Sequence, residues 1–351
     1  MLPRQPAFFV SADWGRDAGK RSVYVADAGA RRVRREISPG WNLKRLMALA
    51  RDLSARGSVL VGIDAALGVP AGYWERVCDE CRPEAPASFV DWLRPIDPSS
   101  GFFDSEATVE DPDAWRTDRP WFAVQPRPGG LDSFKAKTRD RLLRRIDRET
   151  GAKPIFAVRG MPGTVGSGTR SFWRELVPIL ADDRDFAVWP FEGELSSLLA
   201  ETGIVLAETY PGLAYAAALS NALPIHRVMV PKTKRPERER ASDLLERASW
   251  VAAAGVDLGD LAPARDNEDD FDAHFTAAAV LRCVLERRAL VDPDWVDATA
   301  EGSMLLAGPV DPARKAKKFA AWARRSSRTE NADEKGTKEA FKNECRYWFR
   351  A

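Results

Sequence analysis

The pattern of hydrophobic and polar positions at the start of the chain predicts a regular succession of elements. Short apolar segments at 7–12, 22–25 and 33–37, separated by turn residues, predict three strands joined as a meander. Apolar residues then recur at helical spacing over 42–56, and a glycine follows where a helix would end. The continuous apolar run over 58–64 ends in a carboxylate, which is typical of a buried parallel strand. The predicted order is therefore βββαβ.

The pattern then becomes irregular before it resumes. Residues from about 70 to 130 are rich in Pro, Asp, Trp and Gly, which predicts an irregular insertion with short helices near 72–80 and 86–93. The later periodicities predict helices at 131–149, 168–182, 211–219, 238–254 and 269–287, and strands at 186–191 and 204–209. We expect an α/β domain over residues 1–312, built on a mixed sheet flanked by helices, followed by a C-terminal helical extension over 313–351.

Composition excludes several classes of protein. Of the 351 residues, 44% are hydrophobic and 30% are charged, which argues against wholesale disorder, collagen and coiled coil. No apolar run is long enough to span a membrane, and the first residues lack the basic and apolar regions of an export signal. Of the four cysteines, the one close pair, Cys78 and Cys81, lacks the second pair or the clustered histidines that a structural zinc site needs, and a reducing cytoplasm fits best. Because the chain has only 2 histidines, we expect any chemistry to depend on carboxylates.

Charge is concentrated at the C-terminal end. The net charge is +1 overall, but Lys and Arg clearly outnumber Asp and Glu over 313–351, so the body is mildly acidic and the extension is basic. Aromatic residues alternate with these cations, which suits base stacking and phosphate contacts on a nucleic acid. Two amphipathic helices that pack their aromatic side chains on the body are the alternative.

Five carboxylates stand at positions that an α/β sheet would bring together. Asp13, Asp64 and Glu208 end predicted strands, and Asp269 and Asp272 begin the last predicted helix. The carboxyl ends of strands are where sites form in open α/β sheets. Clustered carboxylates repel one another, so such a group favours a divalent cation, and oxygen ligands favour Mg²⁺ or Mn²⁺. This is the ligand chemistry of two-metal phosphodiester hydrolysis.

Each of these positions also has a structural interpretation. An aspartate at a strand end is a common turn former or helix cap, and acidic residues at a helix start interact with its dipole. His274 follows Asp272 closely, and could lie near a metal centre, on the helix surface or in the core.

A short basic segment precedes the predicted helix at 238–254. It consists of Lys232, Lys234, Arg235, Arg238 and Arg240, which could contact phosphates along a nucleic-acid strand. A solvated helix entry explains the same composition equally well.

Several short motifs occur in an order that resembles one protein family. They are Ala12-Asp13-Trp14-Gly15, Val61-Gly62-Ile63-Asp64-Ala65-Ala66-Leu67-Gly68-Val69-Pro70, Glu208-Thr209-Tyr210-Pro211, Lys232-Thr233-Lys234 with Arg238-Glu239-Arg240, and Asp269-Asp270-Phe271-Asp272-Ala273. Together they resemble domain-of-unknown-function family 429, described as predicted nucleases of the ribonuclease H fold. The resemblance covers residues 7 to about 307. The family usually has proline where this chain has Ala66, beside Asp64.

The resemblance implies a ribonuclease H-like βββαβ core and a role for each acidic motif. Asp13 and Asp64 would be the metal ligands of the first and fourth strands, and Asp272, with Asp269 beside it, the ligand of the final helix. Glu208 matches the family motif without a fixed place among those ligands, so we expect it to complete or orient the metal shell.

Three functions follow from these observations. The leading hypothesis is a nuclease that uses Mg²⁺ or Mn²⁺ to hydrolyse nucleic-acid phosphodiester bonds. An ATP-using enzyme of the actin and sugar-kinase type is an alternative, because Asp13-Trp14-Gly15 with Lys20 and Arg21 resembles a phosphate-holding turn. The third is a non-catalytic module on the same fold that binds nucleic acid or protein.

Overall fold

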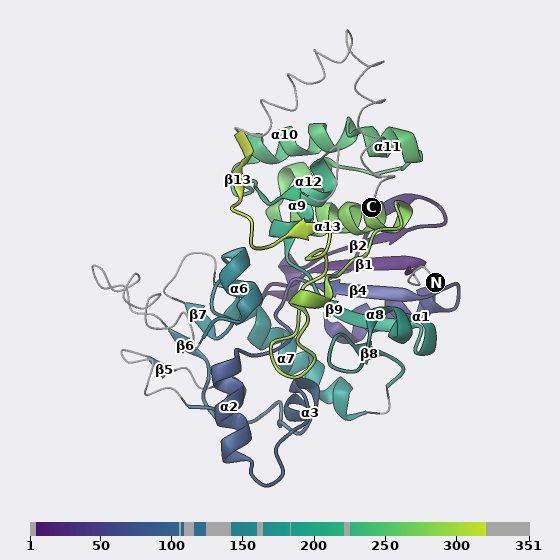
Figure 1. The fold of residues 1–351 in the computed structure, drawn as a ribbon. Helices are drawn as coiled ribbons and strands as arrows, with labels where there is room; N and C mark the ends of the chain where they lie inside the picture. The colour runs from purple at the N-terminus through teal and green to yellow at the C-terminus, as the bar shows by residue number, and fades with distance from the viewer. Residues whose placement is uncertain are drawn as a thin grey trace, which may run out of the picture.

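A six-stranded mixed sheet forms the centre of the computed structural model, which describes residues 5–104, 107–108, 116–123, 142–159, 164–182, 184–220 and 225–320 (Figure 1). The strand order is β3-β2-β1-β4-β9-β8. Their bounds are β1 (Phe8–Asp13), β2 (Ser22–Asp27), β3 (Arg32–Glu36), β4 (Val59–Ile63), β8 (Ala187–Val188) and β9 (Ile204–Glu208). The first three strands are antiparallel neighbours, whereas β4 is parallel to both β1 and β9, and β8 is parallel to β9. The predicted βββαβ order and the α/β class are confirmed.

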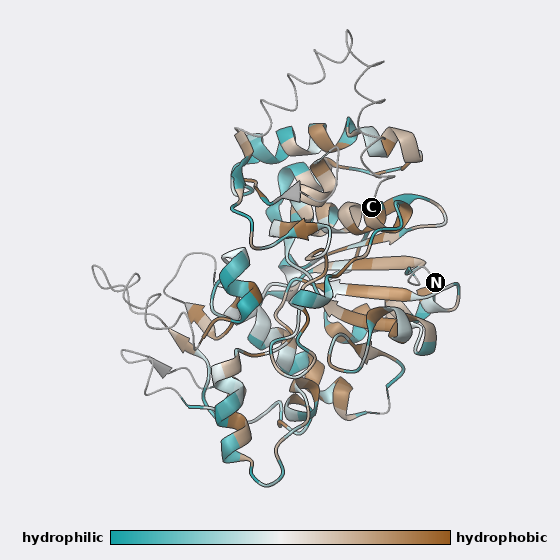
Figure 2. Ribbon diagram, in the orientation of Figure 1, coloured by the Kyte–Doolittle hydropathy of each residue, from teal (hydrophilic) through white to brown (hydrophobic). Residues whose placement is uncertain are grey.

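Helices cover both faces of this sheet because successive residues of the strands point to opposite faces and are apolar on both. In β1, Phe8 and Val10 belong to the core under α1 (Leu43–Ser54) and α7 (Gly166–Ala181), whereas Phe9 belongs to the core under α9 (Pro211–Leu219) and α13 (Glu268–Leu285). Figure 1 shows these two layers on opposite sides of the strands, and Figure 2 shows the strands as predominantly hydrophobic. Buried strands with apolar residues on both faces are what the continuous run at 58–64 predicted.

Local sequence explains where the helices α1 and α13 begin. The Asn42 side chain accepts a hydrogen bond from the Arg45 amide at the start of α1, and Asn267 caps α13 in the same way through the Asp269 amide. Three acidic residues occupy the first turn of α13, where the helix dipole favours negative charge. Every residue of α13 from Asp270 to Cys283 is buried, so this helix crosses the sheet inside the protein.

Several predicted bounds differ from the structure. The predicted strand at 186–191 is reduced to β8, because Pro190 has no amide hydrogen with which to continue the ladder. The predicted helix at 238–254 is two helices, α10 (Arg235–Glu246) and α11 (Ser249–Ala254). Of the predicted helix at 131–149, the structure describes α6 (Arg145–Thr150), and 131–141 lie outside the described residues. The helix α12 (Ala262–Asp266) was not predicted.

The segment predicted as an irregular insertion packs on α7 through aromatic side chains. It contains α2 (Ala71–Glu80), α3 (Phe89–Leu93) and α4 (Gly101–Asp104), and its strands β5 (Ala107–Thr108) and β6 (Phe122–Ala123) form a sheet with β7 (Ala157–Arg159). The ring of Trp173 in α7 lies 5.1 Å from that of Phe89 and 5.4 Å from that of Trp121. The aromatic residues of this segment therefore extend the core that lies under α1 and α7.

The first residues of the predicted extension are part of the body. Two short parallel pairs join this region to the chain before α10: β10 (Ile225–His226) with β12 (Val310–Asp311), and β11 (Val228–Met229) with β13 (Lys317–Lys318). Phe319 is buried in the α9 and α13 core. The rest of the extension, 321–351, lies outside the described residues. Among the described helices, none has the length and apolar character required to cross a membrane.

Candidate metal centre

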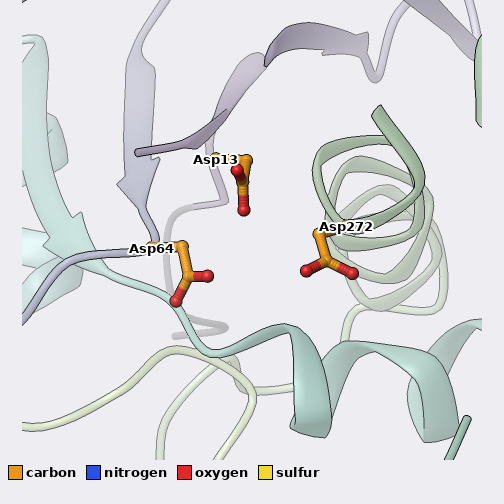
Figure 3. A group of neighbouring side chains, drawn as sticks. All are labelled: Asp13, Asp64 and Asp272. Atoms are coloured by element: carbon orange, nitrogen blue, oxygen red, sulfur yellow. The ribbon is translucent and has the colours of Figure 1, made fainter. Parts of the chain in front are cut away.

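Three of the predicted aspartates converge at one edge of the sheet. Asp13 ends β1 and Asp64 directly follows the neighbouring parallel strand β4, where its amide donates to the Ala12 carbonyl at 2.9 Å. Asp272 projects from α13, which packs across β1 and β2. One carboxylate oxygen from each residue lies within 4.8 Å of those of the other two, and the three side chains point into a common space (Figure 3). The parallel register and the crossing helix together create this cluster.

Burial and mutual repulsion make the cluster costly to ionise. Burial, followed by the negative charge of Asp64, raises the pKa of Asp13 well above its ordinary value. Burial also raises the pKa of Asp64 to about 6. Asp269, one turn before Asp272 on the helix, is half-buried, and burial and neighbouring acids raise its pKa as well. A cation that approached these groups would relieve the repulsion and favour their charged forms.

The chain itself already supplies partners to Asp272. This carboxylate is fully buried, and its Oδ1 atom accepts a hydrogen bond from the Tyr215 hydroxyl, whereas Oδ2 is paired with the ammonium of Lys232. Sequence reasoning missed Tyr215, although it is the only polar side chain in the alanine-rich helix α9 and could have been noticed for that reason. Lys232 was predicted to contact nucleic acid, and the structure directs it into the cluster.

Glu208, which was expected to complete or orient the metal shell, lies in a buried ion pair apart from the three aspartates. Instead of joining the three aspartates, its two carboxylate oxygens accept hydrogen bonds from Arg144 at 2.6 Å each, and one of them also accepts from the Leu67 amide at 2.7 Å. Arg144 is itself buried and is also paired with Asp147 at 2.8 Å. A buried guanidinium requires such partners, so Glu208 is committed to this ion pair. Arg144 lies within the helix predicted at 131–149, but nothing in the sequence distinguished it from the other basic residues of that segment.

The Arg144 ion pair fixes the loop that follows Asp64. Arg144 donates to the carbonyls of Leu67 at 3.0 Å and Glu301 at 3.3 Å, and thereby joins this loop to β9 and to the chain near Glu301. Gly68 has a φ of 115°, and a Cβ atom there would lie 2.5 Å from the Glu301 carbonyl oxygen. Glu208 therefore acts on the candidate site through the loop next to Asp64.

The predicted basic segment is divided between the interior and the surface. Arg238 is buried and donates to the carbonyls of Lys232, Arg265 and Asp266, so it does not form part of an exposed phosphate-binding surface as predicted. Lys234, Arg235 and Arg240 are exposed, although Arg235 is paired with Glu239 and Asp266, and the Arg240 guanidinium lies over Phe319.

Two further residues have structural roles. His274 is buried against Tyr24, and its Nε2 atom donates to the Leu258 carbonyl at 2.8 Å, so it belongs to the core. Arg21, which the ATP-using alternative assigns to a phosphate-holding turn, is buried. It donates to the Gly15 carbonyl at 2.8 Å and is paired with Glu175 at 2.8 Å. The turn after β1 therefore uses this arginine to hold its own backbone.

The donor set fits a small divalent cation. Asp13, Asp64 and Asp272 offer carboxylate oxygens alone, which are the ligands that Mg²⁺ and Mn²⁺ prefer.

The comparisons with known proteins add no further information: no family model, no curated protein and no solved structure matches this chain. The resemblance to domain-of-unknown-function family 429 thus stays a prediction.

Proposed function

We propose that this protein is a metal-dependent nuclease with a ribonuclease H-like fold, which hydrolyses nucleic-acid phosphodiester bonds. The observation that carries the proposal is the convergence of Asp13, Asp64 and Asp272 from β1, β4 and α13. Helix α13 lies across β1 and β2, and β1 is antiparallel to β2 but parallel to β4. This arrangement supports the βββαβ core closed by a helix that the sequence resemblance implies.

The side chains of the cluster suit the binding of Mg²⁺ or Mn²⁺. Asp13 and Asp64 are partly exposed, whereas Asp272 is buried behind them, so the first two carboxylates face the side from which an ion and a substrate would arrive. A divalent ion held there would supply positive charge for the phosphate oxygens and would lower the pKa of an attacking water. Hydrolysis adds that water to phosphorus and breaks one P–O ester bond, which leaves a phosphate monoester and an alcohol.

The remaining residues of the site orient the ligands. Tyr215 fixes the Asp272 carboxylate through its hydroxyl, and the Arg144–Glu208 ion pair holds the loop that follows Asp64. Asp269 adds negative charge from the start of α13 without joining the group of three. The exposed cations Lys234, Arg235 and Arg240, together with the basic extension, are the parts of the chain suited to a nucleic-acid backbone.

Substitution of the two strand aspartates tests the proposal. We expect Asp13→Asn and Asp64→Asn each to abolish Mn²⁺-dependent cleavage in a screen of single-stranded, duplex and branched DNA and RNA. The melting temperature without metal should be unchanged or higher, because each variant removes repulsion between partly buried carboxylates.

Asp27→Asn is the matched control. Asp27 ends β2 at the opposite edge of the sheet, where it pairs in register with Phe8, and its substitution should leave cleavage unchanged. Cleavage that persists in both Asp13→Asn and Asp64→Asn would refute the nuclease proposal.

A further inference from the structure

Lys232 pairs its ammonium group with Asp272, the buried member of the carboxylate cluster. We propose that this ammonium takes the place of a second metal ion, so that the three aspartates bind a single divalent cation. This inference rests on the proposed function, and it changes the expected chemistry from a two-ion centre to one ion and one ammonium.

The contact that Lys232 makes is with the buried member of the cluster. The ammonium is paired with Oδ2 of Asp272, whose side chain is 0% exposed, while the Lys232 side chain itself is 37% exposed. Asp272 is one of the three carboxylates whose oxygens lie within 4.8 Å of one another. Lys232 therefore supplies the positive charge that balances the buried carboxylate of this group.

The backbone of Lys232 is held in position independently of these carboxylates. Its carbonyl accepts a hydrogen bond of 2.6 Å from the buried guanidinium of Arg238, and its amide donates to the Val230 carbonyl at 2.8 Å. Arg238 is anchored in turn by the carbonyls of Arg265 and Asp266, at 3.0 and 2.7 Å. Because the main chain is fixed in this way, movement of Lys232 is restricted to its side chain, and the ammonium remains within reach of the cluster.

Charge balance favours one ion in the presence of this ammonium. Asp13, Asp64 and Asp272 together carry three negative charges when ionised, which one ammonium and one divalent ion neutralise. A second divalent ion would leave the half-buried cluster with an excess of positive charge, and a net charge in such surroundings is costly.

Metal stoichiometry provides the test. Mn²⁺ binding is measured by calorimetry and by counting bound Mn²⁺ with electron paramagnetic resonance, on the wild type and on Lys232→Met. We expect one bound ion for the wild type and two for the variant, with the first ion bound at least about tenfold more tightly, because a competing positive charge is removed. Circular dichroism checks that the variant is folded, and Lys232→Gln is used in its place if it is not.

Two control variants separate charge in the cluster from charge nearby. Lys234→Met removes the same charge from an exposed position two residues further along, and Lys232→Arg keeps the charge in place, so both should bind one ion. An equal number of bound ions in the wild type and in Lys232→Met would overturn the role of Lys232 and leave the metal centre intact. The absence of Mn²⁺ binding in both proteins would overturn this inference together with the proposed metal centre.

Discussion

Replacement of Arg144 by methionine tests how strongly the buried ion pair behind the candidate site stabilises the fold. The Arg144 side chain is 1% exposed, and it donates four hydrogen bonds of 2.6 to 2.9 Å to the carboxylates of Glu208 and Asp147. Methionine fills part of the same volume but provides no donor. The variant therefore retains two carboxylates, with side chains 4% and 1% exposed, and removes the cation that they share.

The expected loss of stability follows from this geometry. Removal of one partner from a buried ion pair costs about 3–5 kcal/mol, because the remaining charge is buried without compensation. We place Arg144→Met in the upper part of that range, because its removal leaves two carboxylates unpaired. The double variant Arg144→Met with Glu208→Gln should recover at least about 1 kcal/mol, because glutamine removes one of the unpaired charges.

Urea unfolding at pH 7, followed by tryptophan fluorescence and circular dichroism, measures these free energies. The matched control is Arg51→Met, since Arg51 also pairs with a carboxylate through two hydrogen bonds, of 2.7 and 3.0 Å to Asp185, but on the surface. With side chains 43% and 52% exposed, that pair should contribute no more than about 1 kcal/mol. Equal losses for Arg144→Met and Arg51→Met, or no recovery in the double variant, would refute the reasoning.

Two further predictions concern His274 and the C-terminal extension. Burial lowers the pKa of His274 to about 4 from 6.5, against the opposing hydrogen bond to Leu258 and the charges of Asp270 and Asp260. The unfolded chain therefore binds a proton in this window when the folded chain does not, so His274 should reduce stability by about 3 kcal/mol as the pH falls from 6.5 to 4. The difference in unfolding free energy between His274→Phe and the wild type should shift by that amount over the same range, and a constant difference would contradict it. Truncation after Ala320 keeps Phe319 in the core and should weaken binding to a nucleic acid while reducing its dependence on salt, as measured by fluorescence anisotropy; unchanged salt dependence would exclude a contact between the extension and phosphate.

The fold was most predictable where the hydrophobic pattern within a single helix or strand was enough to identify that element. The βββαβ order, α1, α7, α9 and α13 follow from short-range periodicity, and each lies close to its predicted position. The strand at 186–191 and the helix at 238–254 were predicted too long, because a proline and a break between two helices interrupt patterns that remain apolar. The aromatic residues around Trp173 could not be assigned, since their partners are distant in sequence.

The candidate site shows the same division between local and distant information. Asp13 and Asp64 could be placed together because parallel neighbouring strands end at one edge, and Asp272 because the last helix had to cover the sheet. No periodicity could show that Arg144 would reach Glu208, or that Arg238 would face inward while Lys232 faced the aspartates. These outcomes depend on which buried charges find partners, and the pairs join residues far apart in the sequence.

The partners of each carboxylate indicate where a metal ion would act. Glu208 is balanced by Arg144, and Asp272 by Lys232 together with the Tyr215 hydroxyl. Asp13 and Asp64 lie close together, and in the part of the chain that the structure describes neither of them forms an ion pair, while burial raises the pKa of both. A divalent ion therefore gains most from Asp13 and Asp64, which are also the more exposed members of the cluster. It follows that Asp13→Asn and Asp64→Asn should each weaken Mn²⁺ binding more than a change at Glu208, whose charge is already neutralised inside the protein.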